Sequence, residues 1–351
     1  MTPAPVRIGD HLISADAEPF VIAELSANHN GSLERALEIV DAVAEAGAQA
    51  VKLQTYTAAT MTIDVRAREF VIGDPTSLWT GRSLYDLYEE AATPWAWHGP
   101  IFERCAARGL VGFSSAFDGS AVDFLESLGV PAFKIASPEA IDLPLIRRVA
   151  KTGKPIIIST GMTDLAELTE AVATARAHGS EVVVLKCTSA YPASVDDANL
   201  RTIAEIRRLL DVQVGFSDHK LGIGAAVTAV ALGASVIEKH VTLSRKDGGV
   251  DSAFSIEPEE LKQLVDGVRA ARRAIGRMQF DPTPGELKSR AFRRSLYIVE
   301  DMRQGELFAE KNLRAIRPAL GLHPKYLDVF LGKRIAADAQ RGTALSWNHL
   351  G

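Results

Sequence analysis

The chain has 351 residues and a net charge of −5, with 47% apolar and 24% charged residues. This composition is typical of a globular protein with a sizeable core, and the acidic balance argues against a basic surface for nucleic acid. The length indicates one large domain with a smaller one attached.

The N-terminus and the cysteines indicate where the protein works. The stretch MTPAPVRIGDHLISAD lacks the basic and apolar segments of a signal peptide. No apolar run approaches the roughly 18 residues that span a bilayer. Cys105 and Cys187 form no pair motif, which favours a reducing compartment. We therefore expect a cytoplasmic protein without a membrane or nucleic-acid partner.

Between about residues 19 and 275, short apolar runs alternate with amphipathic helical segments. The runs are FVIAEL, AVKLQT, LVGFSS, AFKIAS, PIIIST, VVVLKCT, VQVGFS and SVIEKH. Strict alternation of this kind favours parallel strands joined by right-handed crossovers. Eight units in about 250 residues predict an α/β fold, a (β/α)8 TIM barrel. The competing open, doubly wound sheet needs a glycine fingerprint after its first strand, and ELSANHNGS does not supply one.

One interval of the expected barrel is too long. Most expected strand ends are 22 to 30 residues apart, but Thr55 and Ser114 are separated by 59. The excess is an insertion from Thr57 to about Trp79. It is interpreted as an acceptor-specific lid or substrate loop, or as a dimer contact.

The pattern changes after Gly276. MQFDPTPGELKS is rich in turn residues and is typical of a linker. Beyond it, IVEDMRQGELFAEKNL (298–313) resembles IAADAQRGTALSWNHL (335–350) at a distance of 37 residues, which predicts a small β-rich domain. The expected domains are a barrel with a short N-terminal extension over 1–276, a linker over 277–290 and a C-terminal domain over 291–351.

Polar residues follow all eight expected strands, at the barrel end where active sites lie. Serine hydroxyls and lysine charges among them indicate recognition of a phosphate and a carboxylate. This anion cradle consists of Lys52, Ser115, Lys134, Ser137, Ser159 and Ser217. Glu139, and after it Glu24, are the candidates for proton transfer. A desolvated lysine at such a position also permits Schiff-base chemistry, for which Lys134, Lys186 or Lys239 are candidates.

The stretch VGFSDHKLG places His219 after the seventh expected strand, and IEKH places His240 at the end of the eighth. Neighbouring strands lie about 5 Å apart, so both imidazoles can reach one ion. Two histidines with open positions suit a catalytic divalent metal such as Mn²⁺, Co²⁺ or Zn²⁺.

At this point the chain resembles the sialic acid synthase family. The motifs AELSANHNGS, AVKLQTYT, FSSAFD, FKIASPE, IISTGM, KCTSAYP, GFSDHKLG and IEKH occur in the family's order. FRRSLY, DMRQGE and IRPALGLHP resemble its antifreeze-like (type III antifreeze or SAF) C-terminal domain. Within the family, SLWTGRSLYDLYEEAATPWAWH and RPALGLHPKY are most similar to the pseudaminic acid synthases.

The resemblance implies condensation of phosphoenolpyruvate with an N-acetylated hexose, giving a nine-carbon 2-keto sugar acid and phosphate. It implies that the anion cradle binds phosphoenolpyruvate and that His219 and His240 hold a metal, with Mn²⁺ expected and Mg²⁺ or Co²⁺ possible. It assigns sugar contacts to Gln54, Tyr191, Asp251 and Arg317. In the family this arginine comes from the partner subunit of a domain-swapped dimer, so a homodimer is expected.

The acceptor implied by the pseudaminic branch is 2,4-diacetamido-2,4,6-trideoxy-L-altrose. N-acetylneuraminate synthases carry asparagine and threonine where this chain has Ser189 and Ser115. Ser115 keeps a hydroxyl for phosphate, and Ser189 is expected in the sugar half of the site, which disfavours N-acetylmannosamine. The alternatives are a neuraminate or legionaminate synthase, a Schiff-base aldolase that uses pyruvate, and a non-catalytic sugar-binding protein.

Overall fold

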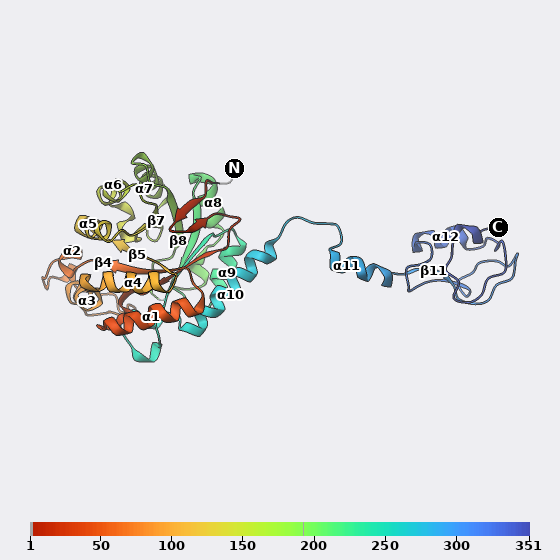
Figure 1. Cartoon of the computed structure of the whole chain (residues 1–351), viewed down its shortest axis with the longest axis horizontal. Helices are drawn as coiled ribbons and strands as arrows, with labels where there is room; N and C mark the ends of the chain where they lie inside the picture. The colour runs from red at the N-terminus through yellow and green to blue at the C-terminus, as the bar shows by residue number, and fades with distance from the viewer. Residues whose placement is uncertain (1–2, 192) are drawn as a thin grey trace. The chain divides into compact units, whose positions relative to one another are not determined.

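The computed structural model describes residues 3–191 and 193–351, which form two compact units that divide between Gly276 and Arg277 (Figure 1). Among these residues, no helix combines the length and the apolar character that a bilayer crossing demands. The unit boundary falls where the predicted linker begins.

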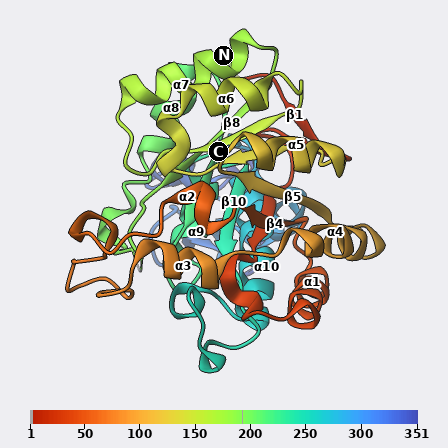
Figure 2. The same ribbon diagram turned by 90° about the vertical axis from the view of Figure 1, so that its left-hand side faces the viewer.

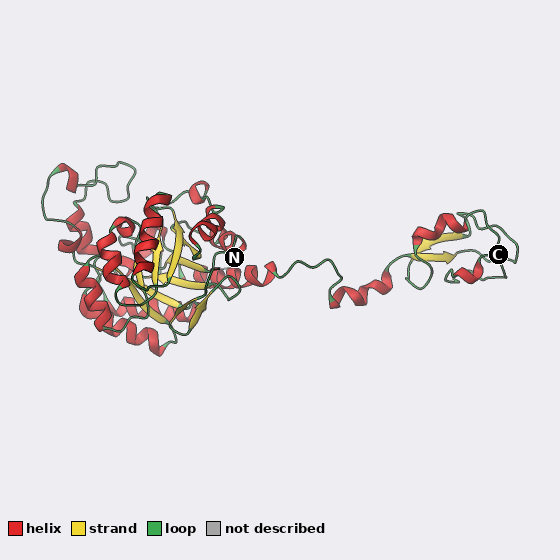
Figure 3. Cartoon of the chain, turned by 90° about the horizontal axis from the view of Figure 1, so that it is seen from above, coloured by secondary structure: helices red, strands yellow, loops and turns green. Residues whose placement is uncertain are grey.

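Eight parallel strands of the first unit close into a barrel in the order β10-β3-β4-β5-β6-β7-β8-β9. This confirms the predicted (β/α)8 barrel and excludes the open sheet. Figure 3 shows the strands enclosed by helices. The strands are β3 (Phe20–Glu24), β4 (Ala50–Thr55), β5 (Val111–Ala116), β6 (Phe133–Ile135), β7 (Ile156–Ser159), β8 (Val182–Cys187), β9 (Gln213–Asp218) and β10 (Val236–His240).

Helices surround the barrel (Figure 2). They are α1 (Leu33–Ala46), α2 (Ala58–Met61), α3 (Leu84–Ala91), α4 (His98–Ala107), α5 (Gly119–Ser127), α6 (Leu143–Ala150), α7 (Leu165–Ala177), α8 (Thr202–Leu210), α9 (Gly224–Ala231) and α10 (Pro258–Ile275). A small antiparallel pair, β1 (Val6–Ile8) and β2 (His11–Ile13), precedes the first barrel strand.

Helix α1 illustrates why these segments fold as they do. The Ser32 hydroxyl accepts a hydrogen bond from the Arg35 N–H and caps the first turn, while Gly47 ends the helix at φ +83°. Ile39 and Val43, four positions apart, are both fully buried. Apolar residues at this spacing share one face, which packs on the barrel.

The second unit contains α11 (Pro284–Ser289), the antiparallel strands β11 (Ser295–Ile298) and β12 (Leu313–Ile316), and α12 (Leu327–Phe330). It has an apolar core of its own, in which Phe308 and Phe330 pack edge to face. The two strands agree with the β-rich domain expected from the sequence.

The two copies of the sequence repeat pair with each other. Met302 bridges Ala339, its own equivalent 37 positions later. Two further pairs recur after a shift of 37 residues in each partner. The Tyr297–Ala344 bridge corresponds to Arg334–Leu307, and the Ile298–Leu313 pair corresponds to Ile335–Leu350. The unit therefore has an internal pseudo-two-fold axis through the Met302–Ala339 bridge.

Candidate active site

Side chains on the barrel strands alternate between the interior and the surrounding helices, as strand geometry requires. Lys52 and Ser217 face inward, because both contact Glu238. Thr55 faces outward, since its hydroxyl lies 2.8 Å from His98 Nε2 of α4. The polar residues at the strand ends therefore do not all converge on one site. Thr55, whose hydroxyl also lies 2.6 Å from Ser114 Oγ, stabilises the contact between the strands and α4.

The interior holds a buried network of opposite charges. The Lys52 ammonium forms an ion pair with Glu24, lies 3.5 Å from Glu238 and donates to the Ser115 hydroxyl at 3.2 Å. Lys134 donates to the Ile135 carbonyl at 3.1 Å, and its ammonium lies 4.0 Å from Glu238. Both lysines of the predicted anion cradle are thus in one place, together with one of the two predicted proton-transfer carboxylates.

Glu238 belongs to this network but was not among the site residues predicted from the sequence. Burial acts to raise its pKa, but the charges of Lys134 and Lys52 prevail and lower it, so Glu238 is ionised. The pKa of Glu24 is raised, chiefly by burial. The signal for Glu238 was present in IEKH, where a carboxylate stands inside a buried strand, two positions before His240.

The serines of the cradle lie at the carboxyl ends of their strands or, for Ser137, just after the strand. Ser137 Oγ accepts a hydrogen bond from the Gly161 N–H at 3.0 Å, and Ser159 Oγ is buried with no partner among the described residues. A Cβ on Gly161 would lie 2.0 Å from Ser189 Oγ and 2.7 Å from Ser137 Oγ, so this position requires glycine. Ser189 therefore borders the anion cradle, whereas the sequence had placed it in the sugar half.

Two histidines from neighbouring strands face each other at the barrel mouth. The ring centroids of His219 and His240 are 5.2 Å apart. His219 Nδ1 lies 3.1 Å from the Thr188 carbonyl oxygen, which favours a proton on Nδ1 and leaves the Nε2 lone pair free. His240 Nδ1 is buried without a hydrogen-bond partner in the described chain, and burial lowers the pKa of His240 well below its usual value.

These properties fit a metal site, because a metal ligand must be a neutral imidazole with an available nitrogen. Within residues 3–191 and 193–351, no group of three or more His, Cys, Asp or Glu side chains lies within reach of one ion. The pair His219 and His240 is thus what the described residues would present to an ion at the barrel mouth.

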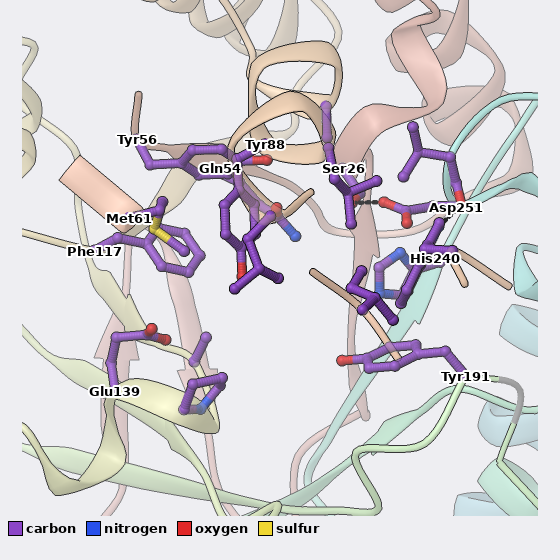
Figure 4. Close-up of a pocket in the computed structure, with 18 of the residues that line it drawn as sticks. Ser26, Gln54, Tyr56, Met61, Tyr88, Phe117, Glu139, Tyr191, His240 and Asp251 are labelled. Atoms are coloured by element: carbon purple, nitrogen blue, oxygen red, sulfur yellow. Dashed lines mark hydrogen bonds between the residues drawn. The ribbon is translucent and has the colours of Figure 1, made fainter. Parts of the chain in front are cut away.

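A cavity of about 350 Å³ opens beside the histidine pair (Figure 4). This volume is in the range of small-molecule sites. In Figure 4, Ser26, His240 and Asp251 lie at one end, and Met61 and Phe117 lie near Glu139 at the other. Ser26 donates a hydrogen bond to Asp251.

Three of the predicted sugar contacts line this cavity, namely Gln54, Tyr191 and Asp251. The hydroxyl of Tyr191 points into it (Figure 4), and its ring centroid lies 4.5 Å from that of His219, with the ring planes tilted by 46°. Glu139 also lines the cavity, from the short 3-10 helix Pro138–Ile141. One of its oxygens is buried without a partner among the described residues, and burial raises the pKa of Glu139 to about 7.

Arg317, the fourth predicted sugar contact, belongs to the second unit. It is exposed directly after β12 and forms no ion pair within the described residues. Its role toward a barrel stays a prediction.

Lys239, a candidate Schiff-base lysine, faces away from the barrel interior. Its ammonium lies 2.7 Å from Asp218 Oδ2 and also donates to the carbonyls of Lys220 and Gly222. Both side chains of the ion pair are fully buried. Because these carbonyls belong to the loop that continues from His219, the ion pair holds that loop in place and is unsuited to attack a substrate.

The described chain is similar to known proteins along nearly its whole length. Residues 39–280 match the NeuB family and residues 293–351 match the SAF domain. A pseudaminic acid synthase of Campylobacter jejuni subsp. jejuni serotype O:23/36 (strain 81-176) is 44% identical over 341 residues, which cover 97% of this chain and 98% of that protein. An N,N'-diacetyllegionaminic acid synthase of Legionella pneumophila is 36% identical over 338 residues, with 94% of each chain covered.

The fold agrees with this relationship. The crystal structure of an N-acetylneuraminic acid (sialic acid) synthetase from Leptospira borgpetersenii, in complex with citrate, matches with a TM-score of 0.73 at 30% identity, over 82% of this chain and 95% of that one. The sequence motifs, the closed barrel and these similarities lead to one conclusion. The chain belongs to the NeuB family and carries a C-terminal SAF domain.

Proposed function

We propose that the protein is a pseudaminic acid synthase, which condenses phosphoenolpyruvate with 2,4-diacetamido-2,4,6-trideoxy-L-altrose and water to give pseudaminic acid and phosphate. The observation that carries this function is the 44% identity to a pseudaminic acid synthase across 97% of the chain. A legionaminate synthase is the second candidate, supported by 36% identity to such an enzyme.

Phosphoenolpyruvate binds in the barrel interior, where Lys52 and Lys134 supply positive charge and the cradle serines supply hydroxyl donors. The unpartnered hydroxyl of Ser159 supports this assignment, because a buried polar group without a partner is costly unless a ligand satisfies it. The sugar binds in the adjoining cavity, against Gln54 and Asp251.

In the reaction, C3 of phosphoenolpyruvate bonds to the aldehyde carbon of the open-chain sugar, and water adds to C2. The C2–O bond to phosphate then breaks. Glu139 takes the proton from the attacking water, since its pKa of about 7 suits proton transfer near neutral pH. That proton then passes to the former aldehyde oxygen, which becomes a hydroxyl, and the C2 hydroxyl proton leaves with the phosphate as the C2 keto group forms. Glu24 is the second candidate for the base. The hydroxyls and ammonium groups of the cradle are already in place to stabilise the charge that develops.

A divalent metal, with Mn²⁺ expected and Mg²⁺ or Co²⁺ as alternatives, is assigned to His219 and His240. When bound, it supplies Lewis-acid polarisation of the sugar aldehyde. The free cysteines Cys105 and Cys187 support a location in the reducing cytoplasm.

The proposed function is tested by phosphate release from phosphoenolpyruvate with Mn²⁺ and one of three acceptors. Release with the diacetamido-trideoxy-altrose alone is the expected result. Release only with the corresponding legionaminate precursor or only with N-acetylmannosamine would contradict the pseudaminic assignment. Borohydride trapping of a pyruvate adduct without phosphate release would instead select the aldolase.

Replacing His240 by alanine is expected to lower kcat by roughly 10²–10³-fold, the range for loss of one electrostatic stabiliser of a transition state. Binding of Mn²⁺, followed by the electron paramagnetic resonance signal of the free ion, should weaken in parallel. His178→Ala, at the end of α7 on the outside of the barrel, is the matched control. Full activity of the wild type after exhaustive chelation would refute the metal assignment.

A domain-swapped homodimer, in which Arg317 enters the partner's sugar site, is tested by subunit mixing. Glu139→Gln and Arg317→Ala are each expected to be impaired. In a mixed swapped dimer, the barrel of the Arg317→Ala chain receives an intact arginine from its partner, so one complete site forms. Activity should therefore recover after the two variants are unfolded and refolded together. A mixture no more active than its components would contradict the swap.

A further inference from the structure

The long insertion between β4 and α3 forms part of the sugar cavity. Five apolar side chains from residues 61–87 line this cavity, and we call them the apolar wall: Met61, Ile72, Trp79, Leu84 and Leu87. The groups from the barrel strands and their loops that line the cavity include the polar side chains of Gln54, Glu139 and Asp251. The barrel also contributes apolar side chains, such as Phe117 and Phe254, so its side of the cavity is mixed. The apolar wall, from the insertion and the start of α3, is apolar throughout.

Backbone hydrogen bonds and a helix cap hold the segments that carry the apolar wall. Ile72 and Ser83 lie on two antiparallel segments joined by the Val71–Ser83 bridge, and the Ile72 N–H donates to the Arg82 carbonyl at 2.9 Å. The Ser83 hydroxyl caps α3, which carries two of the five side chains. This order fixes the positions of the apolar groups over the cavity.

Trp79 connects the wall to the catalytic side of the barrel. Its indole N–H donates to the Val250 carbonyl at 3.1 Å, and its ring lies 5.9 Å from that of Tyr191 and 6.5 Å from that of Phe254. The indole N–H of Trp79 is the one hydrogen-bond donor among the five side chains of the apolar wall, and the Val250 carbonyl already accepts it. What the wall offers to a ligand is carbon and one thioether sulfur.

A surface of this kind favours a methyl group and disfavours a hydroxyl, which would lose its hydrogen bonds to water there. Building on the proposed function, we infer that the apolar wall selects acceptor sugars with a methyl group at C6 over those with a C6 hydroxyl. Gln54 and Asp251, on the barrel side, bind the hydroxyls and acetamido groups that such sugars share, so they do not discriminate at C6.

The inference is tested with two acceptors that differ in one atom, the 2,4,6-trideoxy-altrose and its 6-hydroxy counterpart 2,4-diacetamido-2,4-dideoxy-L-altrose. The wild type should prefer the 6-deoxy sugar by roughly 10–200-fold in kcat/KM, the range for one group in an apolar pocket. In Leu84→Asn and Ile72→Asn, kcat/KM for the 6-deoxy sugar should fall about tenfold while that for the 6-hydroxy sugar holds or rises.

Two controls separate recognition from loss of fold. Leu78→Asn changes a 48% exposed leucine of the same insertion that is absent from the cavity lining, and the preference should stay at the wild-type value. Leu84→Met keeps the wall apolar and should also keep the preference. The KM for phosphoenolpyruvate should be unchanged in all four variants.

Variants that lose activity equally toward both acceptors would overturn the inference, and so would a wild type without preference at C6. The proposed function fails in a different way. If the wild type accepts only the legionaminate precursor, which is also 6-deoxy, the pseudaminic assignment falls. The C6 comparison then uses that sugar and its 6-hydroxy analogue, and either result still decides the role of the wall.

Discussion

Replacing Lys239 by methionine is expected to lower the free energy of unfolding by about 3–5 kcal/mol, the cost of removing one partner from a buried ion pair. Methionine fills a similar volume, so little of the loss comes from packing. The loss comes from Asp218, which stays buried with only the more distant Lys220 ammonium, 3.6 Å away, as a countercharge. The carbonyls of Lys220 and Gly222 also lose their donor.

Urea unfolding followed by circular dichroism measures this loss. Lys262→Met is the matched control, because Lys262 forms an exposed pair with Asp266 on α10 and should contribute only about 0.3–0.5 kcal/mol. The double variant Asp218→Leu/Lys239→Met should be more stable than Lys239→Met alone, since no unpaired charge remains. A single variant as stable as the control would show that the ion pair is dispensable.

Glu139→Gln is expected to lower kcat by roughly 10²–10⁴-fold, the usual contribution of a positioned acid or base. The KM values should change little, because glutamine keeps the shape of the side chain. The wild-type kcat should rise with pH through about 7, as the carboxyl ionises and becomes able to accept a proton from water. In the variant this rise should disappear. Glu126→Gln, at an exposed position of α5, should keep both the rate and the profile.

The same substitution has an independent effect on stability. The folded-state pKa of Glu139, about 7, exceeds its ordinary value of 4.5, because burial penalises the charged form. Folding therefore becomes less favourable as pH rises from 4.5 to 7, where only the unfolded chain ionises readily. The difference approaches about 3 kcal/mol above pH 7, at 1.36 kcal/mol per pKa unit.

Glutamine does not titrate, so the variant should gain stability over the wild type as pH rises from 5 to 8. Unfolding free energies of both proteins at these two pH values test this sign. An equal difference at the two values would mean that the Glu139 carboxyl is not held in a desolvated position. A variant with nearly wild-type kcat would remove Glu139 from the proton-transfer step.

The barrel was predictable because each strand is a short apolar run followed by polar residues, and this pattern is local in the sequence. The pairing of His219 with His240 was also predictable, since it follows from the adjacency of the last two strands. Which strand-end residues face inward was harder to judge. Lys239 and Glu238 are neighbours, yet one supports a loop and the other joins the interior charge network.

The role of the insertion could not be read from its sequence. Its apolar residues are spaced irregularly, and only the folded chain brings Met61, Ile72 and Trp79 to one cavity. The contact between Trp79 and Val250 spans 171 positions and leaves no pattern in either segment. For Arg317 the sequence gives a position and a family role, and the subunit-mixing experiment tests whether the residue reaches a barrel.

The internal symmetry of the SAF domain places different constraints on its paired residues and on the connection between its two copies. Each paired position of residues 298–313 has a symmetry-related position in residues 335–350, which is subject to the same packing constraints. Arg317 lies in the connection between the two copies, outside both of them. Duplication thus supplies a stable support, and the unduplicated connection is free to acquire a new binding specificity without the loss of a paired contact.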